Sequence, residues 1–502
     1  MTRIGTIEGG VRSAAQTTAA AAGFTLFAAL GTFATLVYPP AAAFFLAPAL
    51  LAVAILAPTR ASPRKLAMGL IYVGALTLPL WPVYLHLKLG PAPILTPPRL
   101  VLYALTFLWL YDMAVSPLRR GQFRLALRRG AAITAPVGAL WLLGLLSLPL
   151  AEGRMIAAQE FFRQTTIWLA PFLAIMTYVR RASELRKIVA LLTIAAAVSG
   201  AIALAELASG RLLAEALAPF IGEGADWLRV AQTQKIRDGV FRAQAVHTHP
   251  LSLGEFLSFA APIALAFAIA ARRASRRLAW CACLLLIVGG ALATNSRGAM
   301  IAVAAALSVA GLLFMVRFLK SASAWAFRPA AGLLAALMLV ASPAIFVGGY
   351  AVAAGKAGAS AARSTQSRID QIEQAWPKIL KRPVGGYGTG RAARVLGYWG
   401  ATLTVDNYYL NLALDYGFPG PIALGAILFA MGACALRRSD AGAREMRTVY
   451  VGLAAAALAF ALTRTIVSQT GNLAILYLLL GAMAGAASGA RPRAATQGLA
   501  RA

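Results

Sequence analysis

Arginine residues at the borders of apolar stretches are the clearest chemical signal in this sequence. Four of them stand apart from the rest, namely Arg242, Arg297, Arg368 and Arg464. A guanidinium group keeps its charge at any relevant pH, and its planar fork binds two phosphate oxygens at once. Several such groups at one site would hold a diphosphate and stabilise the charge that grows on it as a bond to it breaks. The sequence therefore predicts an arginine-lined anion site.

The local settings of these arginines support that prediction. Arg242 lies in the stretch Phe241–Pro250, just before an apolar run, and Arg297 lies in the polar break Thr294–Gly298 between two such runs. Arg464 stands near the end of an apolar run, where an ionisable side chain is costly and by default functional. Its side chain could instead extend to the lipid headgroups, and both interpretations stay open.

A carboxylate beside these cations is a candidate general base. Asp406 is followed directly by Asn407 at the start of an apolar run. It could accept a proton from a sugar hydroxyl, or it could simply cap the helix that begins there. His247 and His249, just before Pro250, are alternative bases or turn residues.

The stretch Pro383–Gly390 has four glycines in six residues, with Tyr387 among them. Glycines let a backbone approach a ligand closely, but they also make turns. The external loops predicted below hold no cluster of carboxylates for a cation. The three cysteines, Cys281, Cys283 and Cys434, lie in apolar runs without metal-ligand spacing. We predict neither a metal nor a cofactor.

The elements that must position these residues are membrane helices. The chain has 502 residues, of which 60 % are hydrophobic and 13 % charged, with a mean hydropathy of +0.72. A soluble domain has about 25 % charged residues. Because a helix satisfies its own backbone in lipid, we predict an all-α, polytopic bundle of about twelve to fourteen spans. The predicted spans are about 21–38, 41–57, 66–87, 100–115, 131–150, 161–179, 188–208, 250–271, 278–294, 298–316, 330–352, 408–436, 447–467 and 472–488.

The connectors between the spans predict the orientation of the chain. One alternate set is short and basic, which is typical of the cytoplasmic side. This set is 59–65, 117–129, 180–187, 272–277 and 437–447. Both termini then lie in the cytoplasm, and the long connectors 209–249 and 353–407 lie outside. The positive-inside rule explains much of the net charge of +30, so we predict no nucleic-acid partner.

The second long connector is itself basic, and we expect it to be partly helical. A cationic loop between apolar walls attracts an anionic ligand, although it could also serve only solubility. No cytoplasmic connector is long enough for a nucleotide-binding domain, and neither a Walker loop nor a dinucleotide fingerprint is present. We therefore expect the reaction on the outer side of the membrane. A substrate there must arrive on a carrier other than a nucleotide, such as a lipid. We divide the chain into helices and a first loop (1–239), a core (240–436) and a helical tail region (437–502).

The ordered set of motifs resembles the superfamily of O-antigen ligases and O-antigen or exopolysaccharide polymerases. The resemblance covers roughly residues 240–435. It rests on the stretch Arg242–Pro250, the break Ser296–Gly298, the external loop with Arg368 and Trp376, the stretch Pro383–Gly390, and Asp406–Asn407 with Gly417 and Gly420. Ligases usually have a histidine followed by Asn where this chain has Asp406, and this difference favours a polymerase.

The resemblance implies an inverting, metal-independent glycosyltransferase of the bacterial inner membrane. It would transfer a glycan from undecaprenyl diphosphate to an acceptor hydroxyl at a periplasmic site. Asp406 and Arg297 would act in catalysis. The donor and its sugars would contact Arg242, Arg368, Arg464, His249, Tyr387 and Asn407.

Two alternatives remain open from the sequence. An O-antigen ligase would transfer the finished glycan to a lipid A core instead of a growing chain. A transporter or flippase of lipid-linked oligosaccharide would show repeated halves and charges through the depth of the membrane. The unusual charges of this chain gather near one face, which favours an enzyme.

Overall fold

A computed structural model describes residues 62–86, 94–217, 233–237, 239–319, 359–398, 405–441 and 444–489. Most of these residues are helical. The predicted spans 21–38, 41–57 and 330–352 lie outside them. The elements are α3 (Arg64–Leu80), α4 (Pro97–Val115), α5 (Pro117–Arg129), α6 (Ala131–Ser147), α7 (Arg154–Gln164), the π-helix η1 (Thr165–Leu169), α8 (Ala170–Tyr178), α9 (Ala182–Ser209), α10 (Leu213–Ala216), β1 (Lys235–Arg237), β2 (Val240–Arg242), α12 (Pro250–Ala270), α13 (Ala274–Ala293), α14 (Arg297–Leu319), α16 (Ala359–Lys381), α17 (Ala392–Val395), α18 (Tyr408–Tyr416), α19 (Pro419–Ala441), α20 (Arg444–Thr463) and α21 (Leu473–Ser488).

The all-α membrane bundle is confirmed. Within the described residues, seven helices are long and apolar enough to cross a bilayer, namely α4, α9, α12, α13, α14, α19 and α20. The apolar helix α21 is shorter, and α5 with α6 forms a pair bent by 94°. The predicted loop 353–407 contains α16 and α17, so it is partly helical as expected.

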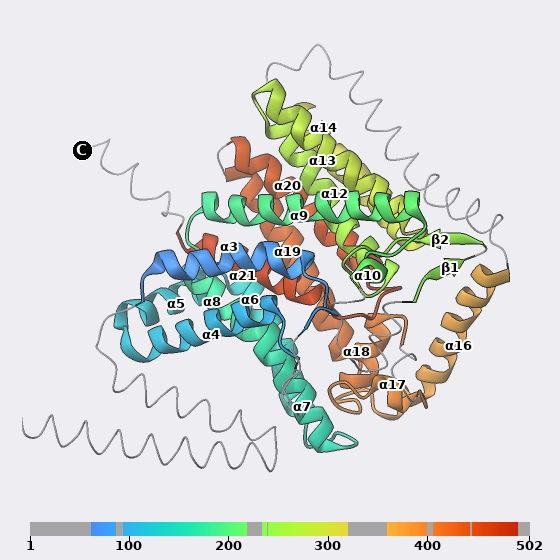
Figure 1. Cartoon of the computed structure of the whole chain (residues 1–502). Helices are drawn as coiled ribbons and strands as arrows, with labels where there is room; N and C mark the ends of the chain where they lie inside the picture. Colours follow the sequence, from blue (N-terminus) through green and yellow to red (C-terminus); the bar gives the residue numbers. More distant parts are fainter. Residues whose placement is uncertain are drawn as a thin grey trace, which may run out of the picture.

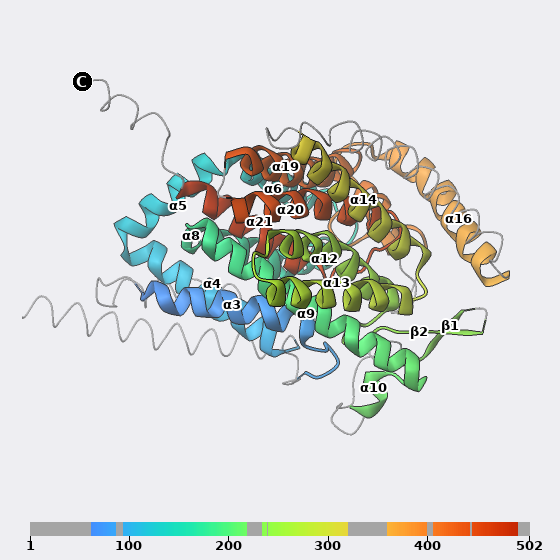
Figure 2. The same ribbon diagram turned by 90° about the horizontal axis from the view of Figure 1, so that it is seen from above.

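The helix α12 occupies the centre of the bundle, enclosed by α9, α13, α14 and α20 (Figure 2). Small residues allow the neighbouring helices to approach closely, as is common in membranes. Where α9 meets α13, a side chain at Gly290 would place its Cβ 2.5 Å from the Cα of Gly200. This tight core fixes the ends of the helices that carry the polar residues discussed below.

One predicted span is interrupted. The run 408–436 was expected to form one helix, but the structure divides it into α18 and α19 at Gly417. Gly417 has a φ of +73°, which ends a right-handed helix, and it forms a bridge with Val384 of the glycine-rich stretch. The prediction of a continuous span is therefore wrong here, because a contact distant in sequence terminates the helix.

Short basic connectors meet at one end of the bundle, which we call the α5 end. There Arg64 donates to the carbonyl of Tyr178, and Arg129 donates to the carbonyl of Ser488. The β1–β2 hairpin, α10 and α16 lie at the opposite end, which we call the hairpin end (Figure 1). The two long predicted external connectors thus share one end, and the side of the membrane that it faces stays a prediction.

Candidate functional site

The hairpin brings cationic side chains together. Strands β1 and β2 pair antiparallel, with Lys235 opposite Arg242. The Arg242 side chain is buried, and its Nε donates to the carbonyl oxygen of Thr294 at 3.0 Å. Its Nη2 has no hydrogen-bond partner within the part of the chain that the structure describes. The stretch after Phe241 and the polar break at Thr294, predicted separately, are therefore in contact.

Like charges surround Arg242. Burial, together with the charges of Arg237 and Arg368, lowers its pKa to about 10. Burial and the charges of Arg242, Lys235 and Arg237 lower the pKa of His249 to about 3, so this histidine is neutral at physiological pH. We call Lys235, Arg237, Arg242 and Arg368 the cationic cluster. An anion bound among them would relieve their mutual repulsion.

A buried carboxylate that sequence reasoning missed shapes the turn behind this cluster. Glu206, near the end of α9, accepts hydrogen bonds from the backbone N–H groups of Gln244 and Ala245, both at 2.8 Å. These bonds hold Ala245 at a φ of +47°, which a side chain rarely adopts. His249 then caps α12, because its Nδ1 accepts from the N–H of Leu251. An acidic residue inside an otherwise apolar run was the available signal.

Arg297 is the first residue of α14 and is half-buried. It follows Thr294 by three positions, and Asn295 between them turns the chain with a φ of +45°. The polar break therefore reverses the chain between α13 and α14 beside Arg242. Of the four predicted arginines, the structure places Arg242, Arg297 and Arg368 at the hairpin end.

Asp406 lies beside Arg368, with 3.8 Å between the carboxylate Oδ2 and the guanidinium Nε. Its side chain is 33 % exposed. Burial raises the pKa of Asp406, and the charge of Arg368 opposes that shift. The helix cap is the next residue, because Asn407 Oδ1 accepts from the N–H groups of Tyr409 and Leu410. The interpretation of Asp406 as the cap is therefore wrong, and its carboxylate is open to an incoming group.

The glycine-rich stretch packs on the protein itself. The N–H groups of Gly385 and Tyr387 donate to carbonyls at the end of α18. The Asp415 carboxylate accepts from three successive N–H groups, those of residues 390, 391 and 392, each at 2.9 Å. A Cβ at Gly386 would collide with the Asp415 backbone. Within the described part of the chain, these glycines allow a close approach to α18 at Gly386, to Ala151 at Gly388 and to Glu160 of α7 at Gly390.

Tyr387 and Asn407 have structural contacts. The hydroxyl of Tyr387 donates to the carbonyl of Lys378 at 3.0 Å, which ties the stretch to the end of α16. The guanidinium of Arg382 lies over its ring. Asn407 is occupied as the α18 cap. Their predicted contacts with substrate stay predictions.

Arg464 is completely buried and paired. Its Nη2 donates to Glu255 of α12 at 2.6 Å, and its Nη1 donates to the carbonyl of Gln469 at 2.8 Å. The guanidinium also lies over the ring of Tyr408, 5.0 Å from its centroid. With 0 % of the side chain exposed, the headgroup-seeking alternative is wrong. Arg464 thus links α12 to Tyr408, the first residue of α18, which follows Asp406 by two positions.

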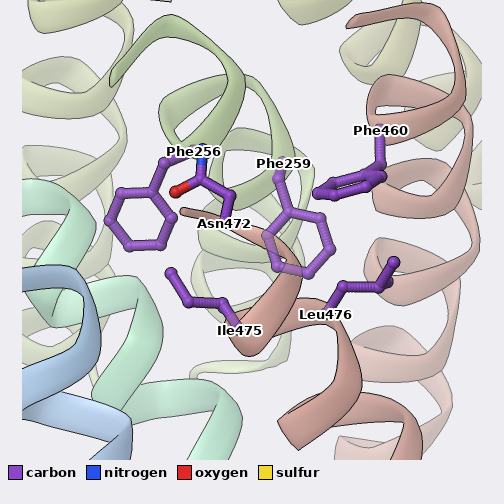
Figure 3. Close-up of a pocket in the computed structure, with 6 residues that line it drawn as sticks. All are labelled: Phe256, Phe259, Phe460, Asn472, Ile475 and Leu476. Carbon is purple, nitrogen blue, oxygen red and sulfur yellow. The ribbon is translucent and has the colours of Figure 1, made fainter. Parts of the chain in front are cut away.

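Glu255 is the partner that sequence reasoning missed. Besides Arg464, its carboxylate accepts from Asn472 Nδ2 at 2.9 Å and from the Thr463 hydroxyl at 3.2 Å. A narrow cavity lies next to this network, between Asn472 and apolar side chains of α12, α20 and α21 (Figure 3). Its volume of about 10 Å³ is enough for about one water molecule, so neither a lipid nor a sugar fits there.

Among the described residues, no group of three or more histidine, cysteine or acidic side chains is placed to hold a metal ion. Comparison with known proteins gives one family. Residues 282–425 match the family described as O-antigen ligase. The matched region contains Arg297, Arg368 and Asp406 but not Arg242 or Arg464. No curated protein matches the chain significantly.

The family match confirms the resemblance to the superfamily of O-antigen ligases and polymerases. It supports a membrane enzyme of the ligase or polymerase type, acting on lipid-linked glycans and acceptors in general.

Proposed function

We propose that this chain, whose residues 282–425 resemble O-antigen ligases, is a polymerase that joins polysaccharide repeat units at the hairpin end. The donor would be an undecaprenyl-diphosphate-linked oligosaccharide and the acceptor a hydroxyl of a growing glycan. The cationic cluster carries this proposal. Its buried member Arg242 has an Nη2 without a hydrogen-bond partner among the described residues, and burial and neighbouring cations lower its pKa.

The chemistry of such a cluster suits a diphosphate. A buried guanidinium without a carboxylate partner is costly, and a ligand with several phosphate oxygens would offset that cost. During transfer the bond between the anomeric carbon and the diphosphate oxygen breaks, and the electron pair leaves with the diphosphate. Cations already in place stabilise this charge without reorganising. Arg242, Arg297 and Arg368 would provide them.

Asp406 would be the general base. Its half-buried carboxylate would accept the proton of the acceptor hydroxyl as the hydroxyl oxygen attacks the anomeric carbon. Attack from the side opposite the diphosphate would invert the configuration at that carbon. Arg368, 3.8 Å away, favours the ionised form that a base requires. Metal-independent transfer is part of this proposal, and we expect full activity in the presence of a chelator.

The remaining predicted residues would have supporting roles. His249 is neutral and would donate or accept a hydrogen bond beside the cluster, without adding charge. Arg464 would act through Glu255 and Tyr408 by holding the start of α18 in place. Asn407 would position Asp406 by capping the same helix.

A second candidate is an O-antigen ligase that transfers the finished glycan to a lipid A core. The observation that favours it is the description of the matched family. Both enzymes would use the same diphosphate chemistry, and they differ in the acceptor.

Deletion of the gene, followed by gel analysis of the surface polysaccharide, distinguishes these candidates. We expect only single-repeat products, which a plasmid copy should convert back to a ladder. Long chains that are not attached to a lipid core would instead indicate the ligase. In reconstituted vesicles, movement of lipid-linked oligosaccharide across the bilayer without lengthening would indicate a flippase and contradict the proposal.

A further inference from the structure

The helix α16 has three distinct faces along its length. One face is buried against the protein and consists of Gln371, Ala375 and Ile379, four residues apart. A second face is polar and includes Arg363, Gln366 and Glu373. The third lies between them and is apolar.

The apolar face, which we call the α16 stripe, consists of Ile369, Ile372, Trp376 and Leu380. Their spacing of three and four residues places them on one side of the helix. Each is between 43 % and 54 % exposed. A row of four large apolar side chains that faced water would be an unfavourable surface, and such patches normally have an occupant.

The stripe continues onto a membrane-spanning helix. The ring of Trp376 meets the ring of Phe418 edge to face, with 6.0 Å between the centroids. Phe418 directly precedes α19, a candidate span. On that helix Ile422 is 69 % exposed and Phe429 is 78 % exposed, as expected for side chains that face lipid. The contact between Trp376 and Phe418 thus joins the α16 stripe to the start of α19, which carries these exposed apolar side chains.

The direction of α16 fits the plane of a membrane. In Figure 1, α3 and α9 run across the picture, and α16 runs steeply beyond their hairpin ends. Figure 2 shows α16 at the same end of the bundle, outside the packed helices. A helix that lies across the end of the spans, with one apolar and one polar face, has the geometry of an interfacial helix.

We propose that the α16 stripe lies in the lipid monolayer at the hairpin end, with its apolar side chains among the acyl chains and Trp376 at headgroup level. Tryptophan is enriched at this depth. Lys381, the exposed last residue of the helix, provides positive charge for lipid phosphates. Because Arg368 directly precedes the stripe, this arrangement would hold the cationic cluster at the membrane surface. The proposal concerns the position of α16 and does not depend on the transfer reaction.

Spin labels at single cysteines test it. The full-length protein, with Cys281, Cys283 and Cys434 replaced by alanine, would be reconstituted in nanodiscs of phosphatidylethanolamine and phosphatidylglycerol. Labels would be attached at I372C and W376C in the stripe. The matched controls are E373C and Q374C on the same helix. Collision rates with oxygen, which enters the acyl region, and with a nickel chelate, which stays in water, report the surroundings of each label.

We expect the ratio of oxygen to nickel collisions to be severalfold higher at positions 372 and 376 than at 373 and 374. Equal ratios at all four positions would place the stripe in water and overturn the proposal. Exclusion of both reagents from the stripe would also overturn it, because another part of this chain, such as 320–358, or a second copy would then cover the face.

Discussion

At the scale of single residues, the surroundings of Arg242 set it apart from Arg464, which is also buried. Arg464 faces a carboxylate at 2.6 Å, whereas Arg242 is surrounded by cations and donates to a carbonyl. The carboxylate of Glu255 neutralises the charge of Arg464, whereas a guanidinium among like charges is ready for an anionic ligand. Sequence reasoning grouped the two residues, because it recognises a charge in an apolar stretch but not its partner.

Removal of Arg242 should therefore weaken binding of the lipid-linked donor. A hydrogen bond to a charged group contributes about 1.5–3 kcal/mol, so we expect R242A to raise the KM for the donor by roughly tenfold or more. R211A, at an exposed arginine of the same end, is the matched control and should leave KM unchanged. Equal effects of the two substitutions would indicate general attraction and not a defined site.

Substitutions at Asp406 and Asn407 distinguish the role of general base from the role of helix cap. D406N should reduce transfer by about a hundredfold or more, since a positioned base contributes roughly 10²–10⁴ in rate, and should leave the melting temperature nearly unchanged. N407A should instead lower the stability by about 1 kcal/mol, the usual cost of a lost cap. Transfer rates and thermal unfolding in detergent would be measured for both. If D406N lowered only the melting temperature, Asp406 would not be the base.

The pH dependence of transfer follows from the same carboxylate. Burial raises the pKa of Asp406. Its carboxylate therefore becomes protonated, and inactive as a base, at a higher pH than a free aspartate does. Activity should be full above this pKa and should fall as the pH falls through it. The acid limb of kcat/KM should therefore lie above the ordinary aspartate pKa of about 3.9, and it should be absent from the residual activity of D406N. An acid limb that persists in D406N belongs to another group.

The pair Glu255–Arg464 should contribute to folding more than to binding. Removal of one partner leaves a buried charge uncompensated, at a cost of about 3–5 kcal/mol. E255L should thus lower the unfolding temperature strongly, whereas E255L combined with R464M should recover much of the loss. A double variant as unstable as the single one would show that the charge of Arg464 is needed elsewhere. Sequence reasoning could not find this pair, because its members lie 209 positions apart.

At the scale of elements, the sequence predicts apolar helices well and their interruptions poorly. The runs that became α9, α12 and α13 are long and predominantly apolar, so their approximate boundaries follow from composition. The break between α18 and α19 depends on Pro383–Gly390, which forms backbone hydrogen bonds with the end of α18. The hairpin β1–β2 was not expected either, since three-residue strands give no periodic signal.

Alanine substitutions at two glycines test whether the contact with α18, or only the backbone turn at the glycine, contributes to stability. Gly386 and Gly397 both have a positive φ. A Cβ would collide with the Asp415 backbone at Gly386, whereas at Gly397 it would meet no described residue within 4 Å. G397A should cost only the conformational penalty of about 1–2 kcal/mol. G386A should cost clearly more, because backbone must also move. Equal melting temperatures would mean that the loop can lift from α18 without loss.

At the scale of the whole molecule, charged side chains gather at two opposite ends of one bundle. The short basic connectors gather at the α5 end, whereas the hairpin, α16 and the cationic cluster gather at the other. Alternating connectors predict such a separation from the sequence alone, since each span reverses the side. The shared end of the hairpin and α16 follows from the same alternation, whereas the pairing of Lys235 with Arg242 across the hairpin does not, because strands of three residues give no periodic signal.

Labelling from outside intact cells tests which end faces outward. Arg211 at the hairpin end and Arg276 at the α5 end are both exposed, so they form a matched pair. In a background without the three native cysteines, R211C should react with a membrane-impermeant maleimide in intact cells. R276C should react only after the cells are permeabilised. The opposite pattern would place the cationic cluster in the cytoplasm, where nucleotide sugars are available. The argument for a lipid-linked donor would then fail, even though the bundle and its arginines were unchanged.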